Sequence, residues 1–105
     1  MVIYISGKIT GTVDYAERFR IAGMRLKKNG YTVVNPAEIG DMLDEMVPFE
    51  LSHDEYMAID LQLLKRCDAI YMLKGFENSD GARMERMKAI AWGKKIFYEE
   101  DGLQY

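Results

Sequence analysis

Four short apolar runs, rich in β-branched and aromatic residues, recur along the chain. They are residues 2–6 (VIYIS), 31–36 (YTVVNP), 68–73 (DAIYML) and 95–99 (KIFYE). Runs of this kind, bounded by Gly, Pro or Asn, are typical of buried strands. The pattern therefore predicts four strands, with Gly7 ending the first and Pro36 closing the second.

Between these runs, apolar residues return every three or four positions, which is typical of amphipathic helices. Helices are predicted over residues 14–29, from 52 to about 66, and from the turn at 75–81 up to Gly93. Two of them begin with the spacing of a capping box, Asp14 with Glu17 and Ser52 with Glu55. Residues 37–51, which are Met-rich and acidic, fit either a short helix or a loop over the rim of the sheet.

Strands and helices alternate along the chain, which is the order expected of a parallel sheet with right-handed crossovers. The predicted architecture is a three-layer α/β/α sandwich, flavodoxin-like, on a mainly parallel sheet of four or five strands. In such sheets ligands bind at the carboxyl ends of the strands, near the switch in strand order. Three segments fall on that edge, at residues 6–11 (SGKITG), 35–38 (NPAE) and 75–81 (GFENSDG).

Composition narrows the class of protein. The chain has 105 residues, so we interpret residues 1–105 as a single domain with one core. A formal net charge of -3 disfavours polymeric nucleic acid and anionic membranes as partners. The one cysteine, Cys67, excludes an internal disulfide, and no apolar run is long enough to span a bilayer. These features predict a cytoplasmic protein that acts on a small molecule.

The predicted ligand edge concentrates glycines, hydroxyls and an amide. The loop at residues 6–11 follows a strand and precedes a helix, so its N–H groups are placed to hold an anion, although its glycines fit a simple turn equally well. The candidate ligand-binding residues on this edge are Ser6, Gly7, Lys8, Ile9, Thr10, Gly11, Asn35, Ser79 and Gly81. The single histidine, His53, is interpreted as structural, and neither a metal nor an organic cofactor is predicted.

Two carboxylates stand out on the predicted helices. Asp60 borders an apolar stripe, where an unpaired charge is unfavourable unless it is needed. Glu85 shares a stripe with Ala82 and Ala89, which turns it inward near the pocket rim. Both also fit a solvated helix face. Together with Tyr4, they form a set suited to chemistry at an anomeric carbon, where one carboxylate attacks and the other handles the proton of the leaving group.

Three segments resemble a known family. Residues 3–11 (IYISGKITG) are similar to the N-terminal signature of the nucleoside 2-deoxyribosyltransferases and the related 2′-deoxynucleoside 5′-phosphate N-hydrolases. Residues 58–73 (AIDLQLLKRCDAIYML) resemble the family's helix and strand, with Asp60 eight residues before Asp68. Residues 79–96 (SDGARMERMKAIAWGKKI) look like its nucleophile helix. The pattern is also similar to that of small phage and bacterial relatives without an assigned activity.

The resemblance implies roles for individual residues. Glu85 would attack C1′ of a 2′-deoxynucleoside or its 5′-monophosphate, and Asp60 would orient the sugar and protonate the departing base. Ser79 would bind the 5′-phosphate, while the loop at residues 7–11 would line the sugar and phosphate. The resemblance also implies that no cofactor is needed and that the protein is a homodimer or a higher homo-oligomer.

The sequence leaves two other classes of function open. Arg86 and Met87 follow Glu85 where the family often has small residues, and Lys8 stands where proline or serine is frequent. A non-catalytic module that senses or sequesters a nucleotide on the same fold is therefore one alternative. An interaction protein whose acids are all solvated is the other.

Overall fold

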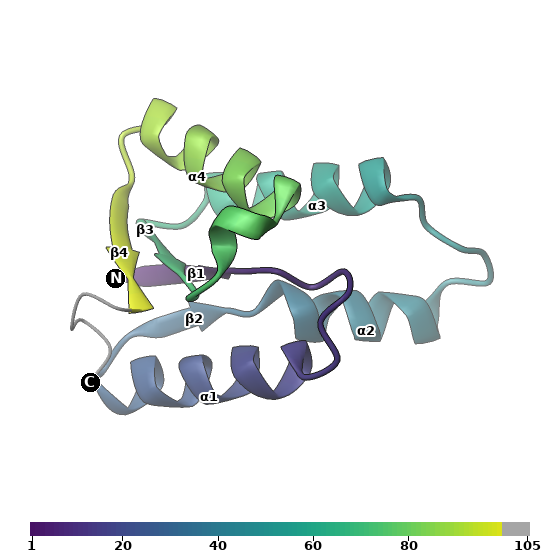
Figure 1. The fold of residues 1–105 in the computed structure, drawn as a ribbon, viewed down its shortest axis with the longest axis horizontal. Coiled ribbons are helices and arrows are strands. Elements are labelled where there is room, and N and C mark those ends of the chain that lie inside the picture. Colours follow the sequence, from purple (N-terminus) through teal and green to yellow (C-terminus); the bar gives the residue numbers. More distant parts are fainter. Residues whose placement is uncertain (100–105) are drawn as a thin grey trace.

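In the computed structural model, which describes residues 1–99, the chain is built on a parallel sheet (Figure 1). Within that range the sheet has four strands in the order β2-β1-β3-β4, with β1 at Val2–Ser6, β2 at Thr32–Val34, β3 at Ala69–Met72 and β4 at Lys95–Tyr98. The chain places β2 on one side of β1 and then crosses to place β3 on the other side, so the switch point lies between β1 and β3. The four predicted strands and the flavodoxin-like arrangement are confirmed.

Helices cover both faces of this sheet. They are α1 at Tyr15–Lys28, α2 at Pro36–Met46, α3 at His53–Lys65 and α4 at Asp80–Ala91, with a 3-10 turn, η1, at Phe76–Asn78. Figure 1 shows α1 on one side of the sheet and α3 with α4 on the other. This arrangement confirms the predicted three-layer sandwich. No helix in residues 1–99 is long and apolar enough to cross a membrane.

Alternate residues of β1 build the two halves of the core. Ile3 and Ile5 point to the α1 side and pack in a cluster with Phe19 and Leu26. Tyr4 points to the opposite side, into a cluster that includes Leu64, Ala82 and Ala89 from α3 and α4. Because side chains alternate across a strand, Ser6 follows Tyr4 onto the side of α3 and α4. This alternation delivers two hydroxyl groups to one face of the sheet.

Residues 37–51, for which the sequence left two possibilities, contain most of α2. The helix begins because the side chain of Asn35 caps it, accepting hydrogen bonds from the N–H groups of Ala37 (3.1 Å) and Glu38 (3.3 Å). Pro36 is the first residue of α2, a position where its fixed φ and missing N–H are favourable. The expectation that Pro36 closes the second strand was therefore wrong.

The two predicted capping boxes differ in outcome. At α3 the box forms, since Ser52 Oγ accepts from the Glu55 N–H at 3.1 Å and Oε1 of Glu55 accepts from the Ser52 N–H at 2.8 Å. At α1 it does not, because Asp14 lies outside the extended region and its side chain makes no cap hydrogen bond. Glu17 accepts instead from Arg20, one turn along the same helix.

Candidate active site

Glu85 is a buried carboxylate on α4. Only 6% of the residue is exposed, and it shares the inner face of the helix with Ala82 and Ala89. These alanines have no bulk beyond Cβ, which lets α4 pack closely against the sheet. The predicted inward orientation of Glu85 follows from this packing, and the solvated-surface alternative does not hold for this residue.

Two hydroxyl groups from β1 hold both carboxylate oxygens of Glu85. The Tyr4 hydroxyl donates to Oε2 at 2.5 Å, and Ser6 Oγ donates to Oε1 at 2.5 Å. All three side chains are buried. Hydrogen bonds to an ionised carboxylate are short and strong, so this pair fixes the orientation of the carboxylate and favours its charged form.

The electrostatics of the two carboxyl groups follow from burial. Burial raises the pKa of Glu85 to about 7; the hydrogen bonds from Ser6 and Tyr4 oppose this rise, and the nearby charge of Asp60 adds to it. Burial also raises the pKa of Asp60 to about 6. The pKa of Tyr4 lies well above its ordinary value, first through burial and then through the charge of Glu85. Tyr4 is thus a neutral donor, while both carboxyl groups exchange protons near neutral pH.

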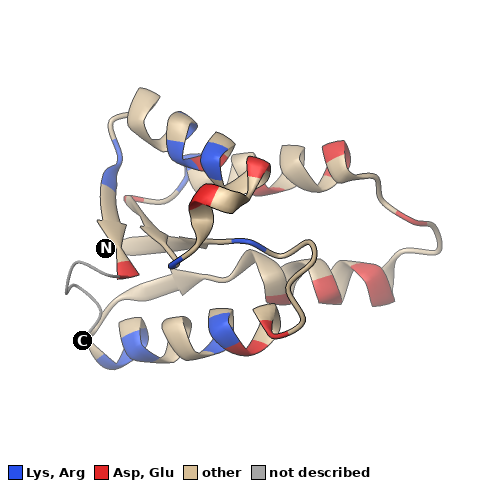
Figure 2. Ribbon diagram, in the orientation of Figure 1, with Lys and Arg blue, Asp and Glu red and all other residues tan. Residues whose placement is uncertain are grey.

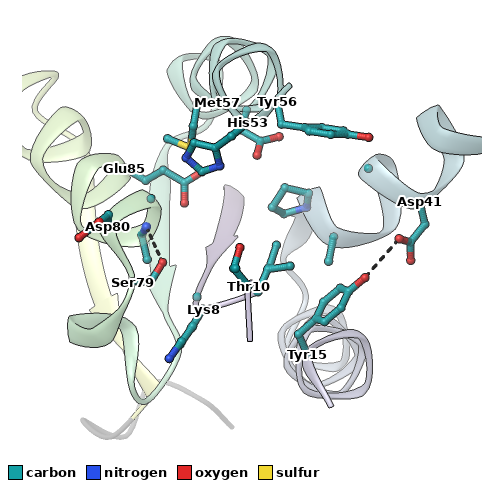
Figure 3. Close-up of a pocket in the computed structure, with 18 of the residues that line it drawn as sticks. Lys8, Thr10, Tyr15, Asp41, His53, Tyr56, Met57, Ser79, Asp80 and Glu85 are labelled. Atoms are coloured by element: carbon teal, nitrogen blue, oxygen red, sulfur yellow. Dashed lines mark hydrogen bonds between the residues drawn. The ribbon is translucent and has the colours of Figure 1, made fainter. Parts of the chain in front are cut away.

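A cavity of about 640 Å³ opens in front of Glu85 (Figure 3). This volume falls in the range of sites that hold small molecules. Its wall comes from the loop after β1 and from all four helices; the lining residues are Gly7, Lys8, Ile9, Thr10, Tyr15, Pro36, Ala37, Gly40, Asp41, Asp44, His53, Tyr56, Met57, Asp60, Asn78, Ser79, Asp80, Gly81, Ala82 and Glu85. It lies at the carboxyl end of β1, beside the switch point.

Most of the residues singled out from the sequence meet at this cavity. Those that line it are Glu85, Asp60, Gly7, Lys8, Ile9, Thr10, Ser79 and Gly81. Tyr4 and Ser6 lie behind Glu85 and reach the cavity only through its carboxylate. Gly11 and Asn35 do not line it. Gly11 occupies an exposed turn with a φ of 76°, and the amide oxygen of Asn35 is used to cap α2.

The start of α4 forms one corner of the cavity. Ser79 Oγ accepts a hydrogen bond from the Ala82 N–H at 3.1 Å, which leaves the hydroxyl hydrogen free to donate. Asp80, the next residue, has its carboxylate in an ion pair with Arg83, and its side chain is 93% exposed. Its charge therefore points to solvent, and the corner itself offers a hydroxyl and helix N-terminal N–H groups.

The opposite part of the cavity was missed by the sequence interpretation. Asp41 and Asp44 from α2 meet two tyrosines there, with Tyr15 donating to Asp41 at 3.5 Å and Tyr56 donating to Asp44. The Asn-Pro pair at residues 35–36 was the available signal, since a cap followed by proline marks a helix start. His53, interpreted as structural, also lines the cavity.

The two residues after Glu85 turn away from the cavity. Arg86 Nε donates to the Tyr98 hydroxyl at 2.7 Å, and the guanidinium lies 5.7 Å from the centre of the same ring. Met87 is 64% exposed. Neither residue lines the cavity, so these departures from the family pattern fall outside the wall of the site. Among residues 1–99 no group of three or more metal-ligating side chains gathers.

The fold is similar to that of nucleoside 2-deoxyribosyltransferases, which confirms the resemblance at the level of fold. A 2-deoxyribosyltransferase from Bacillus psychrosaccharolyticus superimposes with a TM-score of 0.71 and 20% identity, over 93% of this chain and 71% of that one. The CMP N-glycosidase BcmB from Clostridium botulinum gives a TM-score of 0.62 and 22% identity, over 100% and 75%.

The chain belongs to a family described as a domain of unknown function, DUF4406, whose model matches residues 1–98. Among curated protein sequences no significant match is found.

Proposed function

We propose that this protein cleaves the N-glycosidic bond of a 2′-deoxynucleoside or its 5′-monophosphate, with Glu85 as the nucleophile. One observation carries the proposal: a buried glutamate, held at both oxygens by Tyr4 and Ser6, faces a cavity large enough for a nucleoside. The similarity in fold to a deoxyribosyltransferase and to a CMP N-glycosidase supports the same reaction class.

In the first step, Oε of ionised Glu85 forms a bond to C1′ while the bond from C1′ to the base nitrogen breaks. The electron pair stays with the base, and Asp60, in its protonated form, supplies the proton that neutralises it. Burial supports this role, because it raises the pKa of Asp60 to about 6 and keeps a fraction protonated near neutral pH. Tyr4 and Ser6 keep the attacking group fixed.

In the second step, water or a second base attacks C1′ and releases Glu85 as a carboxylate. The incoming nucleophile gives its proton to Asp60, which restores the starting state of both groups. Labelled water distinguishes the two outcomes. Heavy oxygen at C1′ of the sugar identifies hydrolysis, whereas a strict requirement for an acceptor base identifies transfer.

The corner at the start of α4 is our proposed phosphate subsite. The Ser79 hydroxyl and the N–H groups at the helix N-terminus favour an anion, and Lys8 lines the same cavity. Monophosphates should therefore be cleaved with a lower KM than the matching nucleosides. Ser79→Ala should remove most of that difference, and equal KM values in the original protein would refute the subsite.

The decisive experiment measures free base released from the 2′-deoxynucleosides and their 5′-monophosphates, each with and without an acceptor base. Glu85→Gln keeps the shape of the side chain and removes its charge, so it should abolish release. Glu45→Gln, an exposed glutamate outside the cavity, is the matched control and should retain it. If the original protein binds a nucleotide and releases no base, the non-catalytic binding module replaces this proposal.

A further inference from the structure

The cavity has two chemically different ends. Glu85, Ser79 and Lys8 lie toward one end, which the proposed reaction uses for the sugar and phosphate (Figure 3). At the other end, Tyr15 and Tyr56 extend toward α2 from opposite sides. The flat ring face of a nucleobase stacks on aromatic side chains whatever the identity of the base, so the tyrosines supply affinity without selection.

Acidic residues gather along α2 (Figure 2), and the two that line this end of the cavity, Asp41 and Asp44, are not equivalent. Asp44 accepts a hydrogen bond from the hydroxyl of Tyr56. Asp41 receives only a long contact of 3.5 Å from Tyr15, at the limit of a hydrogen bond. An ionised carboxylate can accept about four hydrogen bonds, so Asp41 keeps most of its capacity for a ligand. Gly40, the residue before it, has no side chain to occupy the adjoining space.

We propose that Asp41 is a specificity-determining residue that selects a nucleobase carrying an exocyclic amino group. This inference rests on the proposed function. A carboxylate only accepts hydrogen bonds, and it is a known partner of the amino group of cytosine. A carbonyl at the same place, as in uracil or hypoxanthine, presents lone pairs to lone pairs. The site therefore favours cytosine or adenine nucleosides over their deaminated counterparts.

The test compares binding within matched pairs that differ only at this group: 2′-deoxycytidine and 2′-deoxyuridine 5′-monophosphates, and 2′-deoxyadenosine and 2′-deoxyinosine 5′-monophosphates. Titration calorimetry on the Glu85→Gln variant avoids turnover, and the same titrations on Asp60→Asn guard against a folding defect in the first background. We expect the amino member of at least one pair to bind roughly tenfold more tightly, because a well-placed contact to a base edge discriminates by about this factor.

Adding Asp41→Asn should bring that ratio to about one or invert it, because an amide can donate to a carbonyl. Asp44→Asn and the exposed Asp14→Asn are the matched controls, and both should keep the preference. Equal affinities within both pairs, a preference that survives Asp41→Asn, or no nucleotide binding at all would overturn the inference.

Base release by the original protein separates this inference from the proposed function. Selective binding without base release refutes only the catalytic proposal. Base release with no preference between the members of either pair refutes only the role of Asp41. If release is selective and the preference disappears in Asp41→Asn, both stand.

Discussion

Ser6 Oγ lies 2.5 Å from Oε1 of Glu85, although 79 residues separate them in sequence. The contact forms because Ser6 is the last residue of β1 and faces the side of the sheet that α4 covers. Tyr4, two residues earlier on the same side, holds the other oxygen. Two hydroxyls from one strand thus fix a carboxylate from another layer, and the predictions below follow from this arrangement.

Ser6→Ala should shift the pH profile of the reaction to higher pH. The hydrogen bond from Ser6 lowers the pKa of Glu85, so its loss raises that pKa and leaves less nucleophile at a given pH. We expect kcat/KM at pH values below the pKa of Glu85 to fall by roughly tenfold, in line with a lost hydrogen bond to a charged group. At high pH the deficit should shrink. Ser6→Thr, which keeps the hydroxyl, is the rescue variant, and a uniform loss at every pH would contradict the role.

The pH profile of kcat/KM should be bell-shaped. Turnover requires Glu85 ionised and Asp60 protonated, while burial places their pKa values at about 7 and about 6. Two states of this pair carry a single proton, and the active one, with Glu85 ionised and Asp60 protonated, is therefore the less populated. Its population is largest at pH values between the two pKa values. Asp60→Asn should remove the alkaline limb and reduce the rate by at least about a hundredfold. An unchanged alkaline limb in that variant would exclude Asp60 as the acid.

Stability should fall as pH rises from about 4.5 to about 7. The pKa of Glu85 is about 7 in the folded protein against 4.5 for the free side chain, so the folded state binds the proton more tightly. The stabilisation is complete at pH values below the pKa of the free side chain and is lost as pH rises through the pKa of the folded protein. Its free energy is at most on the order of 3 kcal/mol. Thermal melts between these values should show the decline in the original protein. Glu85→Gln should make the decline shallower, with the remaining slope coming from Asp60, whose pKa burial also raises. Parallel curves for the two proteins would contradict the assignment.

Arg86→Leu should affect stability and leave catalysis intact. Arg86 donates to the Tyr98 hydroxyl and lies over its ring, on the side of α4 away from the cavity. Losing both contacts should lower the free energy of unfolding by about 1 kcal/mol. KM and kcat should match those of the original protein. A selective fall in kcat without loss of stability would mean that the residues after Glu85 do shape the site.

The sequence by itself determined the layers of the fold and the candidate carboxylates. Strand runs and helical spacing depend on the local pattern of apolar side chains, so they can be recognised one segment at a time. Glu85 could be placed on an inner face for the same reason, because Ala82 and Ala89 mark the stripe it belongs to. The box of Ser52 and Glu55 was equally local and formed as predicted.

Only the tertiary structure decided which groups meet. The hydrogen bonds from Tyr4 and Ser6 to Glu85 depend on how α4 lies across β1, which no local pattern encodes. Asn35 shows the opposite outcome, a predicted ligand residue that the fold uses elsewhere. It was expected on the ligand edge, but its side chain caps the start of α2. The acids of α2 reach the cavity because that helix follows β2 and extends past the carboxyl ends of the strands (Figure 1). Long-range packing sets these distances, and sequence spacing alone does not.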